Sequence, residues 1–383
     1  MQPKLFIWYP YNDGEMGIKP TSLFRRNFDS KKFLFLIKTI LINNEIKIIF
    51  FLYNKRKSKF KYILQILKLY VWAISNNLNC FNIKFTSNLS KIGKEDIFYG
   101  QSRVILQSKI YKLFKNRNFK LALHLSHYEI NTREKGLMAE EILVDRFVAE
   151  TNLYKHSKYF RRYFPYYKKD VYIMPIVAQG RFKSYKDFFK RKNKCIVSGR
   201  TIILNNKEYS DFVEFFQFKY QHPMRYWIFE NRKSNSKEIT NFISNSSILI
   251  NESKNKNKSV TAKNIKENYY EGFDIVKEFN NHTMFVAPEE LNDLPTLTVS
   301  EGVACGCVLI ATKDYIYQGW GLIPNFHYIS YDGSYDDLIK KINYYINNIN
   351  ELNIIAKNGQ DYFKKKINSE NVTKNFVKFL KKI

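Results

Sequence analysis

Residues 288–312, PEELNDLPTLTVSEGVACGCVLIAT, constrain the fold of this chain more than any other segment. An acidic loop leads to Pro295, a short stretch with a helical pattern carries Glu301, and small residues then lead into the apolar run Val308–Ala311. Proline is common at the first position of a helix, so we expect a helix to start at Pro295. The segment therefore predicts a loop, a helix and a buried strand in succession, as in a layered α/β protein.

The same alternation extends over the rest of the chain. Short apolar runs predict strands, and the segments between them have helical patterns. Strands that are separated by helices pair in parallel, so we expect two Rossmann-like α/β sheets that face each other across a cleft. The predicted strands are residues 5–10, 45–53, 96–100, 120–127, 144–151 and 171–177 in the first half, and 194–200, 246–253, 282–290, 307–312 and 327–333 in the second.

The length of 383 residues allows two domains of ordinary size. We expect residues 1–180 to form the first domain and residues 194–365 the second, with the polar and basic segment 178–194 as their connection. The chain is mostly helical from residue 336 onward, and residues 366–383 are predicted to be a C-terminal helix that can pack back on the first domain.

The charge of the chain points to an anionic partner. Lysine and arginine number 63 against 35 aspartates and glutamates, which gives a net charge of +28. Such an excess attracts nucleotides, nucleic acids and anionic lipid headgroups. Composition bias explains part of it, but bias alone does not favour lysine over glutamate. The basic residues are spread over both halves without a recognition motif, so we expect no nucleic-acid partner, and a basic nucleic-acid-binding protein is kept as an alternative.

Apolar segments and cysteines bear on the compartment. The longest apolar stretches, 33–53 and 61–74, are interrupted by polar residues before they reach the ~20 residues of a membrane span. Segment 61–74 suits a core-facing helix, which we favour, or an interfacial helix on anionic lipid. The four cysteines lack metal-ligand spacing and indicate reduced thiols. Because the first apolar run is also too short for a secretory signal, we expect a cytoplasmic protein, with peripheral attachment to the inner face of the membrane left open.

Several residues lie where α/β proteins bind ligands. Gly199 and Arg200 end a predicted strand, and Arg200 can hold a diphosphate through two hydrogen bonds. The bare amides near Thr296 and Leu297 suit a phosphate group. Lys207, on what we expect to be the start of the next helix, is either a second cation for the diphosphate or an ordinary surface lysine.

Two further positions in the first half follow predicted strands. Gly14 lies in the loop after strand 5–10, as a ligand contact or as part of a plain strand–helix turn. His127 ends strand 120–127 and can bind or polarise a hydroxyl, whereas His124 is better read as a structural histidine. No histidine or cysteine is spaced for a metal site.

Residues 295–312, PTLTVSEGVACGCVLIAT, resemble the nucleotide-sugar-binding segment of two-domain, GT-B fold glycosyltransferases, especially the "group 1" enzymes. Those enzymes carry Glu, seven residues, Glu, then small residues and a strand. Here Asp293 holds the first position, unless Glu289 or Glu290 takes its role, and Glu301 holds the second. The resemblance is strongest over residues 282–335. It implies that Glu301 binds the ribose, Asp293 the transferred sugar, His127 a sugar or acceptor hydroxyl, and Gly199, Arg200, Lys207, Thr296 and Leu297 the diphosphate.

The resemblance also implies an activity. It predicts a hexosyltransferase that uses a UDP- or GDP-sugar, with retention of configuration the expected outcome. The implied acceptor is a bacterial cell-surface polysaccharide, a lipopolysaccharide-type or glycoprotein glycan, or a lipid-linked intermediate. Neither a cofactor nor a metal ion is expected. A nucleotide-sugar epimerase on the same fold is the second alternative.

Overall fold

The computed structural model describes residues 3–8, 34–43, 45–53, 59–125, 127–245 and 274–383. The chain forms two compact units, unit 1 (residues 1–177 and 368–383) and unit 2 (residues 178–367). Each unit is an α/β layer structure with one parallel sheet. Gly14 and the predicted strand 246–253 lie outside the described residues.

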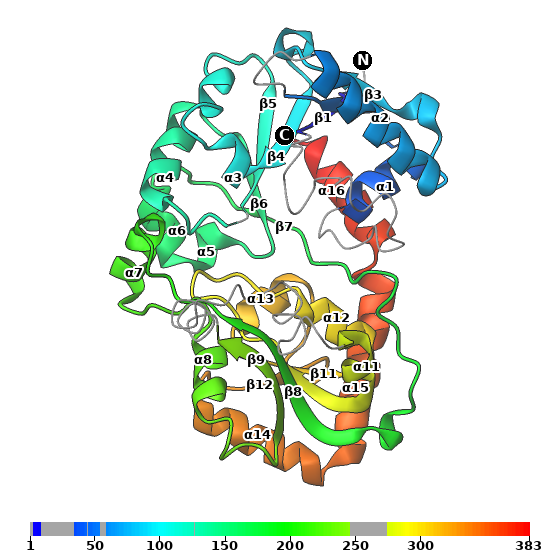
Figure 1. The fold of residues 1–383 in the computed structure, drawn as a ribbon, viewed down its shortest axis with the longest axis vertical. Coiled ribbons are helices and arrows are strands. Elements are labelled where there is room, and N and C mark those ends of the chain that lie inside the picture. The colour runs from blue at the N-terminus through cyan, green and yellow to red at the C-terminus, as the bar shows by residue number, and fades with distance from the viewer. Residues whose placement is uncertain (1–2, 9–33, 44, 54–58, 126, 246–273) are drawn as a thin grey trace, which may run out of the picture. The chain divides into compact units, whose positions relative to one another are not determined.

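Unit 1 is built on a seven-stranded sheet in the order β3-β2-β1-β4-β5-β6-β7, with every pair parallel (Figure 1). The central strands are buried along almost their whole length, as expected for a parallel sheet with helices on both faces. The strands are β1 (Leu5–Trp8), β2 (Ile48–Phe51), β3 (Lys84–Thr86), β4 (Ile97–Gln101), β5 (Lys120–His124), β6 (Arg146–Ala149) and β7 (Tyr172–Ile173).

The helices of unit 1 come from both ends of the chain. The C-terminal helix α16 (Ser369–Leu380) packs on α1 and contacts the sheet, where Phe376 lies 5.0 Å from Tyr99 and Phe379 stacks on Tyr172 at 4.0 Å between ring centroids. The last segment of the sequence therefore completes the core of the first unit. The other α-helices are α1 (Leu34–Asn43), α2 (Lys59–Ser75), α3 (Ser102–Ile105), α4 (Thr132–Glu141), α5 (Leu153–His156) and α6 (Lys158–Tyr163).

Unit 2 has a five-stranded parallel sheet in the order β12-β11-β10-β8-β9. Its strands are β8 (Lys192–Thr201), β9 (Ile239–Asn245), β10 (His282–Val286), β11 (Val308–Ala311) and β12 (Ile329–Ser330). Its α-helices are α7 (Ser210–Phe216), α8 (Pro223–Glu230), α11 (Ile275–Asn281), α12 (Thr298–Ala304), α13 (Asp314–Gly319), α14 (Tyr335–Asn347) and α15 (Ile349–Lys366).

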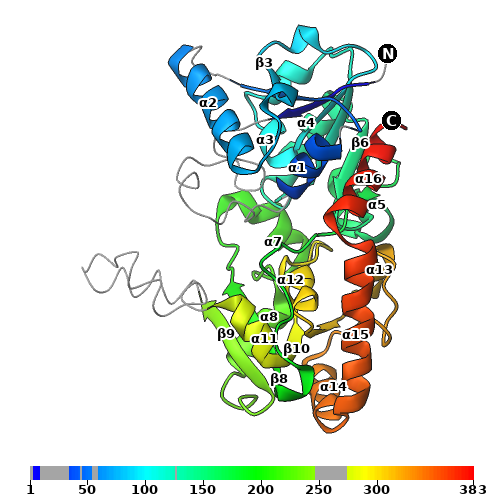
Figure 2. The same cartoon turned by 90° about the vertical axis from the view of Figure 1, so that its right-hand side faces the viewer.

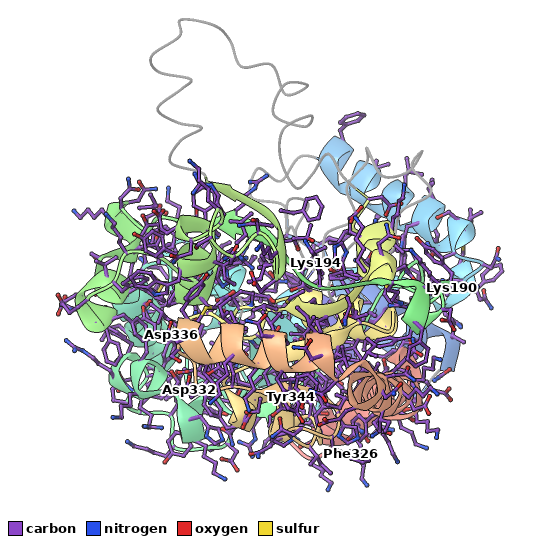
Figure 3. All side chains as sticks on the ribbon, turned by 90° about the horizontal axis from the view of Figure 1, so that it is seen from below. Lys190, Lys194, Phe326, Asp332, Asp336 and Tyr344 are labelled. Atoms are coloured by element: carbon purple, nitrogen blue, oxygen red, sulfur yellow. The ribbon has the colours of Figure 1, made fainter. Side chains whose placement is uncertain are left out.

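Helix α14 shows how the apolar pattern of the sequence is used. Leu338, Ile342 and Tyr345 are buried in the core of unit 2, at the helical spacing that the sequence predicts. Figure 3 shows α14 on the surface of unit 2, with Asp336 near the start of the helix and Tyr344 near its end. One side of the helix therefore packs on the sheet and the other carries polar and aromatic side chains.

Two expected boundaries differ from the structure. Helix α12 begins at Thr298 and not at Pro295. Before the helix, the Glu290 amide donates to the Leu294 carbonyl, and Leu297, the N-cap residue, already has helical backbone angles. Segment 178–194, expected as a connection, belongs to unit 2. There Arg191 is buried and donates to the Cys305 carbonyl at 2.9 Å.

Candidate functional site

The strand order of unit 2 reverses between β8 and β10. The strand that follows β8 lies on one side of it, and β10 lies on the other side. The connections at such a point leave the sheet in opposite directions, and ligands of open α/β sheets bind there, outside the carboxyl ends of the strands. The segments at this edge are those that follow Thr201, Val286 and Ala311.

Gly199 lets an arginine side chain approach the end of β8. Its φ of +122° lies in the region that favours glycine, and a Cβ atom at this position would lie 2.7 Å from Cζ of Arg225. Arg225 comes from α8, is buried, and donates from Nη1 to the Arg200 carbonyl oxygen at 3.0 Å. Two arginines thus meet at one strand end, and the side chain of Arg200 is exposed there.

Lys207 lies where the helical segment after β8 begins. It begins the 3₁₀ turn Lys207–Tyr209, which precedes α7, and its side chain is exposed. Lys207 therefore lies at the start of the next helical segment, as expected, and α7 itself begins at Ser210.

His222 ties α8 to the loop that follows β10. Its Nδ1 lies 3.1 Å from the Pro288 carbonyl oxygen, and the Leu291 amide donates to the Gln221 carbonyl at 3.0 Å. Burial and the positive charge of Arg225 hold the pKa of His222 well below its usual range. The imidazole is therefore neutral at physiological pH, and its place beside Pro288 implies a proton on Nδ1.

Asp293 is held by two donors from the β11–α13 segment. Its Oδ1 accepts a hydrogen bond from Nζ of Lys313 at 2.8 Å and another from the hydroxyl of Tyr315. Lys313 also donates to the Glu290 carbonyl at 2.8 Å. Burial and the charge of Asp293 raise the pKa of Tyr315, so this phenol stays a donor. The carboxylate of Asp293 is only slightly exposed, and its orientation is fixed.

Glu289 lies inside the fold. Its Oε1 accepts from the Thr312 amide at 3.1 Å and from the hydroxyl of Tyr317 at 2.8 Å, and burial raises its pKa. These bonds fasten the end of β10 to the end of β11. Glu289 thus has a structural setting that differs from that of Asp293.

The small residues around α12 have identifiable packing roles. A Cβ atom on Gly302 would lie 2.5 Å from the ring of Phe285 on β10, so the helix can lie this close only with glycine there. At the helix end Gly306 has a φ of +76°, and the amides of Gly306 and Cys307 donate to the carbonyls of Val303 and Gly302. This is the Schellman arrangement, which ends the helix at a glycine.

Thr296 and Leu297 lie directly before the first residue of α12. The hydroxyl of Thr296 lies 2.8 Å from that of Thr298, and Leu297 is exposed at the N-cap position. The sequence predicts phosphate-binding amides at Thr296 and Leu297. In the structure these two residues directly precede α12, whose first residue is Thr298.

Glu301 differs from the other acids of unit 2. Its carboxylate is partly buried and accepts no hydrogen bond from the residues that the structure describes. Burial raises its pKa to about 7, and the positive charge of Arg181 opposes this shift. Buried polar groups are nearly always paired, and unpaired carboxylates with shifted pKa values gather at functional sites.

His127 of unit 1 is supported by a buried acid. Its φ is +47°, its half-exposed ring places Nδ1 3.2 Å from Oε1 of Glu129, and its carbonyl oxygen accepts from Nζ of Lys135 at 2.8 Å. Glu129 is buried. His124 is itself fully buried and lies 3.2 Å from the hydroxyl of Tyr99, in a structural setting.

In the sequence, Arg225 is a second basic candidate with only weak positional support, and Glu129 is interpreted as a solvated surface acid, but the structure buries both side chains. His222 and Lys313 were missed. The pair His222–Pro223 is a visible helix-start pattern, and Lys313 directly follows a predicted strand, so both could have been selected by position. In the part of the chain that the structure describes, no three His, Cys, Asp or Glu side chains are grouped so that they could hold a metal ion.

No protein-family model matches this chain, and no curated protein matches its sequence. Solved structures do match it along nearly its whole length. HepE from Anabaena, solved in complex with UDP and glucose, is 10% identical with a TM-score of 0.55, and the alignment covers 99% of this chain and 100% of HepE. A sucrose-phosphate synthase from Thermosynechococcus elongatus is 10% identical with a TM-score of 0.55, covering 99% of this chain and 98% of the synthase.

These likenesses establish the fold. The chain has two Rossmann-like α/β domains of the GT-B type, and the fold predicted from the sequence is confirmed.

Proposed function

We propose that this chain is a glycosyltransferase that moves a sugar from a nucleotide-activated donor to an acceptor hydroxyl. The observation that carries the proposal is Glu301, a partly buried carboxylate without a hydrogen-bond donor among the described residues and with its pKa raised to about 7. A ribose offers two adjacent hydroxyl donors for such a group. The GT-B fold supports the proposal, since the similar HepE was solved with UDP and glucose.

The donor would be held mainly by electrostatics. Arg200 and Arg225 stabilise the diphosphate as it leaves, together with the amides near Thr296 and Leu297 and the exposed Lys207. Gly199 keeps the strand end open to Arg225. Preorganised donors of this kind act on charge that develops in the transition state, and that contribution is often the largest one in catalysis.

We propose that the side chains of Asp293 and His127 contact the sugar. Asp293, oriented by Lys313 and Tyr315, accepts hydrogen bonds from the transferred sugar. His127, oriented by Glu129, binds a hydroxyl of the sugar or of the acceptor. The bond between the anomeric carbon and the diphosphate oxygen breaks, the acceptor oxygen bonds to that carbon, and the acceptor proton passes to the departing diphosphate. We propose retention of configuration.

The remaining features of the proposal follow from the charge and the resemblance. We propose a UDP- or GDP-hexose donor and a bacterial cell-surface glycan or lipid-linked acceptor at the inner face of the membrane. The net charge of +28 favours such anionic partners. The basic side chains proposed to contact the diphosphate also lead us to propose that no metal ion or other cofactor is needed. Sugar transfer that continues at the same rate in the presence of EDTA would agree with this.

The test is a thermal-shift panel of UDP, GDP and their sugars on the wild type and on Glu301→Ala. We expect one donor to stabilise the wild type, with about ten- to hundredfold weaker binding by the variant, the loss of a hydrogen bond to a charged group. Asp361→Ala, which removes an exposed carboxylate on α15, is the control and should respond like the wild type. The proposal fails if no nucleotide stabilises the protein, or if Glu301→Ala responds equally.

Product analysis separates the alternatives. An epimerase would release free nucleotide and an epimerised sugar without any acceptor, whereas a transferase releases the nucleoside diphosphate and a glycosylated acceptor. A nucleic-acid-binding protein would show tight, salt-sensitive retention of DNA or RNA on a filter and no response to nucleotide sugars.

A further inference from the structure

Helix α2 has two apolar faces, and the residues that the structure describes cover only one of them. Leu69, Trp72 and Ala73 are buried in unit 1, and Tyr70 contacts the ring of Phe85 on β3 at 6.4 Å between centroids. This face fixes the helix to the edge of the sheet. Figure 2 shows α2 near β3, which is the edge strand.

The opposite face of α2 carries a stripe of exposed apolar side chains. Their spacing of three, four, four and three residues places them on one side of the helix, and each is at least 44% exposed. Just after the helix, the side chain of Phe81 is 91% exposed. The stripe consists of Phe60, Ile63, Leu67, Val71 and Ile74. The core-facing reading of segment 61–74 therefore accounts for only one of its two faces.

The segment around this stripe is uniformly basic. From Ile46 to Lys94 the sequence has ten lysine and arginine residues and no aspartate or glutamate. Lys47 and Lys84 lie close enough that the charge of Lys84 lowers the pKa of Lys47. Exposed apolar side chains along a helix, in a sequence segment whose charged residues are all basic, match the chemistry of an anionic bilayer surface.

We propose that α2 docks unit 1 on an anionic lipid bilayer, with the stripe inserted at the boundary between headgroups and acyl chains. A spanning role does not fit, because no helix in the described ranges is long and apolar enough to cross a membrane. A second copy of the chain is a poorer occupant, because two identical basic surfaces would repel each other. A bilayer supplies both the apolar phase and the negative charge.

The test is co-sedimentation of the full chain with vesicles of phosphatidylcholine, alone or mixed equally with phosphatidylglycerol. We expect binding to the mixed vesicles that weakens as salt is added, and little binding to the neutral ones. The double variant Ile63→Gln/Leu67→Gln should bind at least about tenfold more weakly, because two buried apolar side chains are lost from the bilayer. Circular dichroism confirms that the variant is folded.

The matched control replaces two equally exposed apolar residues outside the stripe, Leu137→Gln on α4 and Ile354→Gln on α15. It should bind like the wild type. Absent vesicle binding, equal binding to neutral vesicles, or an unaffected stripe variant each overturns the proposal. So does a dimer in light scattering that the stripe variant abolishes, since the occupant is then a second copy. No donor sugar enters the measurement, so its outcome is separate from that of the proposed sugar transfer.

Discussion

Glu301 couples the stability of unit 2 to pH at the scale of a single side chain. In the folded chain its pKa is about 7, against an ordinary value of 4.5, because burial disfavours the ionised form. A folded state that holds a proton more tightly than the unfolded state loses stability as the pH rises between these two values. The folded protein without a ligand is therefore less stable when Glu301 is ionised, and the ionised carboxylate is the form that would accept hydrogen bonds from a ribose.

The first prediction concerns Glu301→Gln, which cannot ionise. Below the unfolded-state pKa the variant and the wild type should be about equally stable. Above about pH 7 the variant should be more stable by about 1–2 kcal/mol, a figure reduced from the full shift because the carboxylate is partly exposed to solvent. Urea unfolding at about pH 5 and about pH 8 measures this. A difference that does not change with pH would show that burial does not shift this carboxyl group.

The loop that carries Asp293 shows what a residue pattern can and cannot predict. The spacing of Asp293 and Glu301 selects both acids from the sequence. It does not reveal that Lys313 and Tyr315 hold Asp293, because those contacts depend on how the ends of β10 and β11 lie in the sheet. The donors that hold an acid in place are therefore set by the neighbouring strand ends and not by the spacing of the acids in the sequence.

At the scale of elements, the contact between β8 and α8 depends on Gly199. The strand end and Arg225 approach so closely that no other residue fits without displacement. The positive φ at Gly199 adds a second reason for glycine.

Gly199→Ala should therefore lower the free energy of unfolding by about 1–3 kcal/mol and displace Arg225, with weaker stabilisation by a nucleotide sugar. Gly180→Ala is the control, because no described atom lies within 4 Å of a Cβ atom there, and its effect should stay within about 0.5 kcal/mol. Denaturant unfolding and the thermal-shift assay check both variants. Equal stabilities for the two would mean that α8 can shift without loss.

Most elements could be predicted because apolar runs and polar loops alternate clearly. Strands β1, β2, β4, β8, β10 and β11 lie within or overlap the predicted segments. Strand β9 was missed because its sequence, ITNFISN, mixes polar residues into an edge strand of the sheet. The exposed face of α2 could not be predicted either, since a helix that is apolar on both sides does not indicate which side meets the core.

At the scale of the whole molecule, unit 1 is made from two distant parts of the chain. Helix α16 contributes Val372, Phe376, Val377 and Leu380 to its core. The preceding helix α15 belongs to unit 2, where Phe363 is buried and lies 6.4 Å from the ring of Trp320. Two consecutive helices thus stabilise different units.

Phe376→Ala should accordingly loosen unit 1, and Phe363→Ala should loosen unit 2. Each substitution removes a buried ring and should cost about 3–5 kcal/mol in the unit that holds it. Hydrogen exchange followed by mass spectrometry reports each unit separately. If Phe376→Ala leaves the exchange of β4 and β7 unchanged, α16 is not part of the cooperative core of unit 1.

The return of α16 has a consequence for the order in which the protein is made. Every residue of unit 2 leaves the ribosome before residues 368–383, so unit 2 can fold while unit 1 still lacks a helix. Domains usually fold in the order of their synthesis. Here the unit that is started first is finished after unit 2, and the nascent chain carries an incomplete unit 1 until residues 368–383 have been made.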